Sequence, residues 1–93
     1  MATVKQTYTR TSTDVNWYIP SELEKSYINE TYPNLVYGRA FDGDFVYIKT
    51  RTGSIEDCQR FYNELQDSTS TVFMARRKYQ EDNNITYTIE LIE

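Results

Sequence analysis

The most regular alternation of apolar and polar positions lies between Leu35 and Arg51, where two strand-like runs flank a short turn signal. The runs are LVYGRAF and FVYIKTR, and the turn residues are Asp42-Gly43-Asp44. β-Branched and aromatic residues on both sides of a Gly-containing turn are typical of a β-hairpin. We therefore predict a hairpin over residues 35–51. Its two carboxylates belong to a turn, because the further acidic ligands of a calcium loop are missing.

Two registers of this hairpin are open, and they assign side chains to opposite faces because the side-chain period in a strand is two residues. A two-residue loop at Asp42-Gly43 places Ala40 opposite Phe45 and scatters the aromatic side chains over both faces. A loop one residue longer, Asp42 to Asp44, places Phe41 opposite Phe45 and gathers the aromatic side chains on one face. We favour the longer loop, since burial of an aliphatic face outweighs a turn preference.

In the longer-loop register the hairpin has one aliphatic face and one face that combines rings with cations. The aliphatic face is predicted to pack under the helices and holds Val36, Gly38, Ala40, Val46 and Ile48. The other face, named here the aromatic-basic face, holds Tyr37, Arg39, Phe41, Phe45, Tyr47, Lys49 and Arg51. Aromatic residues and Arg are enriched in protein interfaces, so this face is the predicted partner-binding surface. The alternative is that another part of the same chain covers it.

Two helices are predicted from capping signals and helical spacing. Ser21 with Glu24 is a capping box, and Pro33 stops the first helix near Tyr32. The predicted inner stripe of this helix is Leu23, Tyr27, Ile28 and Thr31. Ser54 repeats the capping signal before a second helix. Its apolar stripe is Ile55, Cys58, Phe61, Tyr62 and Leu65, which makes Cys58 a small core residue.

The N-terminal residues are predicted to add strands to the sheet. Residues 3–10 are Thr-rich and form a predicted edge strand. Residues 15–19 are also β-prone, and Pro20 ends them. This second run either pairs with the first as a hairpin, which we favour, or packs as an extended arm.

The C-terminal residues are predicted to form another hairpin, from strands at 71–80 and 85–92. Asp82-Asn83-Asn84 is its predicted turn, because Asn and Asp tolerate the left-handed conformation that such turns require. In this hairpin Arg76 lies on the face away from the core, directly across from Glu90.

Length and composition predict one domain over residues 1–93 and argue against several classes of function. The sequence has no His and one Cys, which weakens hydrolase and metalloenzyme hypotheses, and we predict no catalytic site, metal or cofactor. No run approaches the length of apolar sequence needed to cross a bilayer. We expect a soluble, cytoplasmic protein that does not bind membranes.

The predicted order of strand, helix, hairpin, helix and hairpin resembles a ferredoxin-like α+β domain with an extra terminal hairpin. The resemblance implies an antiparallel sheet with two helices on one face. In outline the chain is also similar to dimeric α+β-barrel proteins, including cofactor-free monooxygenases, whose sheets pack across a two-fold axis. Those enzymes commonly use His, Asn or Trp in a cavity between sheet and helices, and His is absent here.

The opening residues TYTRTSTDVNWYIP resemble the start of small uncharacterised proteins of tailed marine phages. This resemblance implies a viral accessory or virion component, found in the host cytoplasm or in the virion.

We therefore predict a small non-enzymatic protein-interaction module, which self-associates or binds another subunit through the aromatic-basic face. One alternative is a single-stranded nucleic-acid binder, because rings on this face can stack on unpaired bases while its cations contact phosphates. The net charge of -4 argues against that alternative. Another is a small-molecule-binding, oxygenase-like α+β barrel with Trp17 and neighbouring tyrosines around a cavity.

Overall fold

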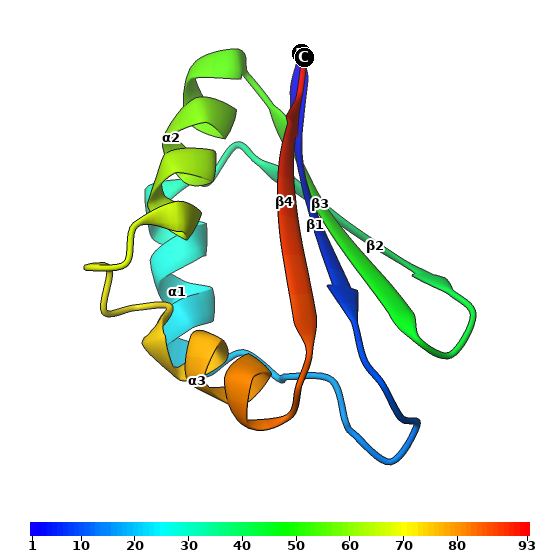
Figure 1. The fold of residues 1–93 in the computed structure, drawn as a ribbon. Helices are drawn as coiled ribbons and strands as arrows, with labels where there is room; N and C mark the ends of the chain where they lie inside the picture. Colours follow the sequence, from blue (N-terminus) through cyan, green and yellow to red (C-terminus); the bar gives the residue numbers. More distant parts are fainter.

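Three helices cover one face of a four-stranded antiparallel sheet in the computed structural model, which describes residues 1–93 (Figure 1). The strands are β1 (Ala2–Thr9), β2 (Val36–Asp42), β3 (Val46–Gly53) and β4 (Thr86–Ile92). The helices are α1 (Glu22–Thr31), α2 (Ile55–Gln66) and α3 (Met74–Asp82). The strand order is β2-β3-β1-β4, so the predicted ferredoxin-like α+β fold is confirmed. None of the helices is long and apolar enough to cross a membrane.

The N-terminal strand lies inside the sheet, between β3 and β4, so its prediction as an edge strand was wrong. Its alternate side chains Ala2, Val4, Gln6 and Tyr8 are buried against the helices. Residues 15–19 form neither helix nor strand, which contradicts the favoured N-terminal hairpin and agrees with the extended arm. β1 already pairs with β3 on one side and β4 on the other, so residues 15–19 cannot pair with it as a hairpin.

The predicted hairpin at residues 71–92 was wrong in its first half, because residues 74–82 form α3. The inner stripe of α3 consists of the polar residues Arg76 and Gln80, so hydrophobic spacing does not reveal this helix. Asn84 does adopt a left-handed conformation, with φ 55°. It ends the helix in a Schellman motif, in which the Ile85 N–H donates to the Gln80 carbonyl at 2.9 Å.

Both predicted helix starts are confirmed, since Ser21 Oγ accepts from the Glu24 N–H and Ser54 Oγ from the Asp57 N–H. The inner stripe of α1 was partly wrong. Leu23 is 73% exposed, and Glu24 faces inward together with Ile28. Glu24 makes no return bond to the Ser21 backbone, so only half of the predicted capping box forms.

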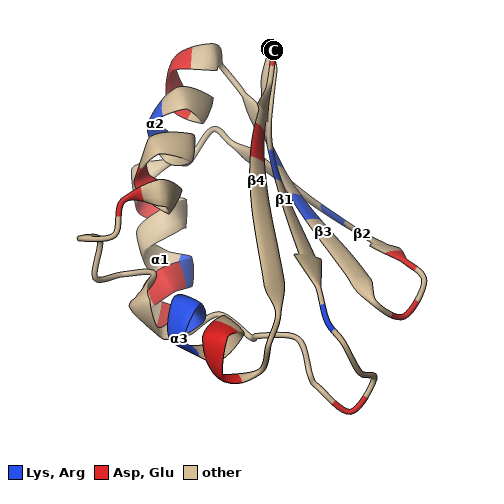
Figure 2. Ribbon diagram, viewed as in Figure 1, with Lys and Arg blue, Asp and Glu red and all other residues tan.

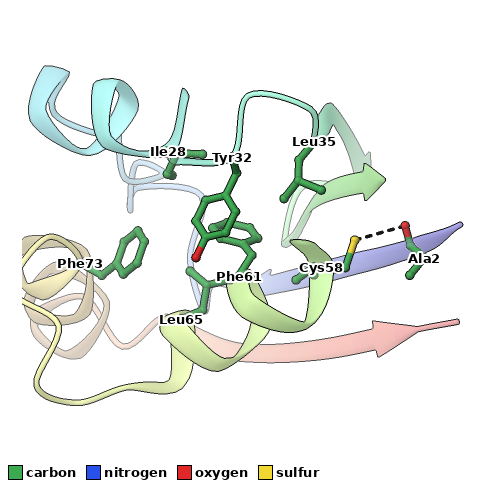
Figure 3. Close-up of a cluster of buried hydrophobic side chains, with 9 residues drawn as sticks. Ala2, Ile28, Tyr32, Leu35, Cys58, Phe61, Leu65 and Phe73 are labelled. Carbon is green, nitrogen blue, oxygen red and sulfur yellow. Dashed lines mark hydrogen bonds between the residues drawn. The ribbon is translucent and has the colours of Figure 1, made fainter. Parts of the chain in front are cut away.

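The main core lies between α2 and the centre of the sheet, and α1 and α3 close its sides (Figure 3). Cys58, Phe61 and Leu65 project from α2 toward β1, as predicted, whereas Ile55 of the predicted stripe is exposed. The buried Cys58 thiol donates to the Ala2 carbonyl at 3.4 Å, which fits its predicted role as a core residue. α2 packs against β1, β3 and β4, whereas α1 makes no comparable contact with any strand.

A matched pair of Phe substitutions tests this core. Phe61 is 1% exposed and Phe45 is 48% exposed. We expect Phe61→Ala to lower the free energy of unfolding by about 3 to 5 kcal/mol, because it leaves a cavity in the packed core. Phe45→Ala should cost less than about 1 kcal/mol. Urea denaturation measures both, and equal losses would contradict the placement of the core.

Candidate functional site

The hairpin register differs from both predicted ones, and the aromatic-basic face lies on the helix side of the sheet. The loop has the predicted length but comprises residues 43–45, so Asp42 pairs with Val46 and Phe41 with Tyr47. Gly43 adopts φ 68° at the start of this loop, while Asp42 remains in the strand. Each residue of the first strand pairs two positions further along the second strand than predicted. Because side chains alternate with a period of two, the same residues still share each face.

The orientation of these faces was predicted wrongly, and the pairing of β1 with β3 explains why. Residues directly opposite each other point to the same face, and Gln6 and Tyr8, which face the helices, lie opposite Lys49 and Tyr47. Residues of the predicted aliphatic face line the other, uncovered face of the sheet, where Val36 and Ala40 are exposed and Gly38, Val46 and Ile48 are partly buried. The large half-apolar side chains of Tyr and Lys can serve as an inner face themselves.

The seven predicted site residues divide into a covered group and an exposed group. Tyr47 is 8% exposed, and Lys49 and Arg51 are partly buried. Tyr37, Arg39 and Phe41 are exposed on the edge strand β2, and Phe45 is exposed in the turn. The structure therefore brings six of the predicted residues together around one cavity, Tyr37, Arg39, Phe41, Tyr47, Lys49 and Arg51.

This cavity has a volume of about 500 Å³ and lies between α1, the arm that precedes it, and the strands β2 and β3. That volume falls within the usual range of small-molecule sites, about 300 to 1,000 Å³. Buried apolar side chains from the core form part of its wall, namely Ile28, Phe61, Leu65 and Phe73. Polar residues form the rest of its inner wall: Gln6, Glu24, Lys49 and Arg76.

The exposed residues of the lining mark the mouth of the cavity. They come from the arm, α1 and the edge strand: Ile19, Lys25, Asn29, Tyr37, Arg39 and Phe41. Phe41 stacks on Tyr47, with ring centroids 4.7 Å apart and an interplanar angle of 11°. The Tyr37 and Tyr47 hydroxyls are 3.2 Å apart and hydrogen-bonded, so the rings of β2 and β3 form a continuous aromatic side of the cavity.

Residues 10–20 hold Trp17 at this cavity. The Arg10 backbone N–H donates to Phe45 O at 2.9 Å, and its side chain donates to Asp44 O and to Val15 O, each at 2.7 Å. The same guanidinium lies 4.5 Å from the centroid of the Trp17 ring. Trp17 packs in turn against Tyr47, with centroids 5.6 Å apart. The α+β-barrel alternative requires a cavity near Trp17, and the structure has one.

Four of the five cations that line the cavity have no carboxylate partner, and only Lys25 at the mouth has one, Glu22. The only ion pairs in the structure are Lys25–Glu22, Arg60–Asp57 and Lys78–Asp82, on the helices. Arg39 lies directly opposite Lys49 in the sheet, an arrangement of like charges that destabilises a strand pair. Glu24 is the one carboxylate among the lining residues, against Lys25, Arg39, Lys49, Arg51 and Arg76. The cavity therefore has an excess of positive charge.

Burial and neighbouring cations change the ionisation of this group. Burial lowers the pKa of Lys49 to about 8, an effect that Glu24 opposes and that Arg76 and Arg51 reinforce. Burial also lowers the pKa of Arg51, while it raises that of the Glu24 carboxyl. Burial and the hydrogen bond that Tyr37 shares with Tyr47 raise the pKa of Tyr37 to about 12. A cluster of perturbed groups around one cavity is typical of a functional site.

Arg76 and Glu24 are the site residues that the sequence prediction missed. Arg76 was predicted on an exposed strand opposite Glu90, but α3 carries it into the interior, where Tyr8 and Tyr87 accept from its Nη1. A signal was present, since Phe73, Arg76 and Gln80 recur at helical spacing. The basic positions on the strands and the acidic ones on α1 and α2 appear in Figure 2.

The fold and this site define a ferredoxin-like α+β protein with a cationic, aromatic cavity between α1 and the sheet. No group of three His, Cys, Asp or Glu side chains in the structure could hold a metal ion. No protein family, curated protein or solved structure matches this chain at a significant level.

The ionisation of Lys49 predicts an unusual dependence of stability on pH. Its pKa is about 8 in the folded protein against 10.5 ordinarily, so between these values the unfolded chain binds more protons and stability rises with pH. One pKa unit corresponds to about 1.4 kcal/mol, and we expect a gain on the order of 2 kcal/mol from pH 8 to 10. Burial raises the pKa of Tyr8 and Tyr32 above the ordinary 10.0, so stability should fall again at higher pH as the unfolded tyrosines ionise.

Urea denaturation of the wild type, Lys49→Met and Lys5→Met across this range tests the assignment. Lys5 lies on the uncovered face of the sheet and serves as the matched control. The alkaline gain should disappear in Lys49→Met and persist in Lys5→Met. A gain of the same size in all three proteins would assign it to other groups.

Proposed function

We propose that this protein binds a small organic anion with an apolar, aromatic body in the cavity beneath α1. The observation that carries the proposal is a cavity of about 500 Å³ whose lining combines aromatic rings with four cations that have no carboxylate partner, Arg39, Lys49, Arg51 and Arg76. An anion that enters the cavity relieves the repulsion between Arg39 and Lys49, while its apolar part displaces water from Ile28 and Phe61.

The charge distribution of the protein supports an anionic ligand over a cationic one. The net charge is -4, yet only one carboxylate lines the cavity. Positive groups at the mouth, among them Lys25 and Arg39, oppose the repulsion of the remaining surface and draw anions toward the opening. Such a cavity needs no reacting group to hold its ligand, so we propose a binding protein and not an enzyme.

Two matched ligands test the proposal with Trp17, the single tryptophan, as the reporter. 3-Phenylpropanoate and 3-phenylpropan-1-ol have the same ring and chain, but only the first is an anion. We expect saturable binding of the anion, seen as a change in Trp17 fluorescence, with an affinity about tenfold above that of the alcohol. Isothermal titration calorimetry provides the stoichiometry, which should be one ligand per chain.

Lys49→Gln and Lys5→Gln locate the site. The first removes a cation from the cavity, so it should weaken binding of 3-phenylpropanoate several-fold, by about 1 kcal/mol. The second removes the same charge from the uncovered face and should bind like the wild type. Absence of binding by the wild type, or equal effects of both substitutions, would reject the proposed site.

Self-association is the second candidate function, and the exposed aromatic rings support it. Tyr37, Phe41 and Phe45 are exposed at the open edge of the sheet, where large aromatic side chains commonly bind protein partners. The predicted interaction module therefore remains a proposal. Its contact surface would be these three exposed rings instead of the whole aromatic-basic face. Nucleic-acid binding stays a prediction without such support, because Lys49 and Arg51 are partly buried beneath the helices. The predicted viral context stays a prediction as well.

Analytical ultracentrifugation at micromolar concentration tests self-association. We expect a dimer or larger oligomer whose dissociation constant rises at least about tenfold in Phe45→Ala, since aromatic residues dominate interface energies. Val36→Ala removes an exposed apolar side chain from the other face and is the control. A wild type that remains a monomer would exclude this candidate and leave ligand binding unaffected.

A further inference from the structure

Two oppositely charged side chains at the inner end of the cavity are buried without being paired. Arg76 and Glu24 are each 3% exposed, and both line the cavity. No ion pair joins them, although the charge of Arg76 acts on the pKa of Glu24. Glu24 Oε1 and the Arg76 atoms Nε and Nη2 have no hydrogen-bond partner. Buried polar atoms without partners are costly, so two such residues in one cavity point to a ligand.

The free atoms of Arg76 form the edge of the guanidinium that suits a carboxylate. Its Nη1 donates to the hydroxyls of Tyr8 at 3.2 Å and Tyr87 at 3.1 Å, which fixes the plane of the group. Its centre also lies 5.2 Å from the ring centroid of Phe73. The remaining Nε–H and Nη2–H are parallel donors, and such a pair binds both oxygens of one carboxylate.

The free atom of Glu24 requires a donor instead. Only the backbone N–H of Glu24 takes part in the cap with Ser21, at 3.2 Å, so the cap leaves the carboxylate Oε1 without a partner. An ionised carboxylate accepts hydrogen bonds and cannot donate them. A plain carboxylate ligand would satisfy Arg76 and leave Glu24 facing a second negative charge. A ligand with a donor beside its carboxylate satisfies both residues.

We propose that Arg76 and Glu24 together select an aromatic carboxylic acid that carries a hydroxyl group on the carbon next to the carboxylate. This inference rests on the proposed anion-binding function. The carboxylate binds to Arg76 Nε and Nη2, the neighbouring donor bonds to Glu24 Oε1, and the ring packs against the aromatic wall that includes Phe61 and Phe73.

Calorimetric titration with 3-phenyllactate and 3-phenylpropanoate tests the inference, because the two acids differ by one hydroxyl group. The wild type should bind 3-phenyllactate about tenfold more tightly. In Glu24→Met, a replacement of similar length, this preference should fall below about twofold. The same variant should bind 3-phenylpropanoate at least as tightly as the wild type, since a negative charge has been removed. Glu30→Met, an exposed position on the same helix, should keep the preference.

The outcomes separate this inference from the proposed function. If the wild type binds both acids equally, or if Glu24→Met keeps the preference, the selection by Glu24 is wrong while anion binding stands. If the wild type binds neither acid, the proposed function fails and the inference fails with it. Arg76→Lys keeps the charge and loses the parallel donors, so it should weaken binding of both acids. A folded variant with unchanged affinities would exclude the assigned role of Arg76.

Discussion

The pairing of β1 with β3 is the constraint on which the rest of this structure depends. β1 presents Ala2 and Val4 to α2, and the core fixes that orientation. Because paired residues share a face, the pairing places Lys49 opposite Gln6 and Arg51 opposite Val4, on the helix side. A sheet with cations on its inner face cannot be covered by apolar side chains alone. The cavity beneath α1 lies where these cations are.

Side-chain contacts join α1 and the residue that caps it to α2, next to the cavity. The hydroxyls of Tyr27 and Tyr32 both donate to the Glu64 carboxylate, and the Tyr32 ring packs on Phe61 at 5.1 Å. Glu64 of α2 thus bonds to one residue within α1, Tyr27, and to its C-cap residue, Tyr32. With the helix held from the side, its inward residues Glu24 and Ile28 face the sheet across the cavity. The proposed binding site lies beneath the helix that these contacts anchor.

The sequence predicts the parts of this fold that depend on local signals. Ser21, Ser54 and Pro33 locate two helices, and the two-residue period sorts the hairpin side chains correctly even though the register is shifted. Which face turns inward depends on β1, which is distant in sequence. Residues such as Tyr47 also bury as readily as Val46, so hydrophobicity could not decide. α3 escaped prediction because its buried stripe is Arg76 and Gln80, for which periodicity of apolar residues gives no signal.

The buried polar groups lower the stability of the protein and would link its folding to the proposed ligand. Desolvation of Lys49 disfavours its charged form, and Arg76 keeps donors without partners in the interior. A core of similar shape built from apolar residues would be at least as stable, as replacements of buried charges in other proteins indicate. A ligand that completes these hydrogen bonds binds the folded state alone and stabilises it in proportion to its occupancy. Under the proposed function, the same residues that weaken the free domain provide the free energy and the selectivity of binding.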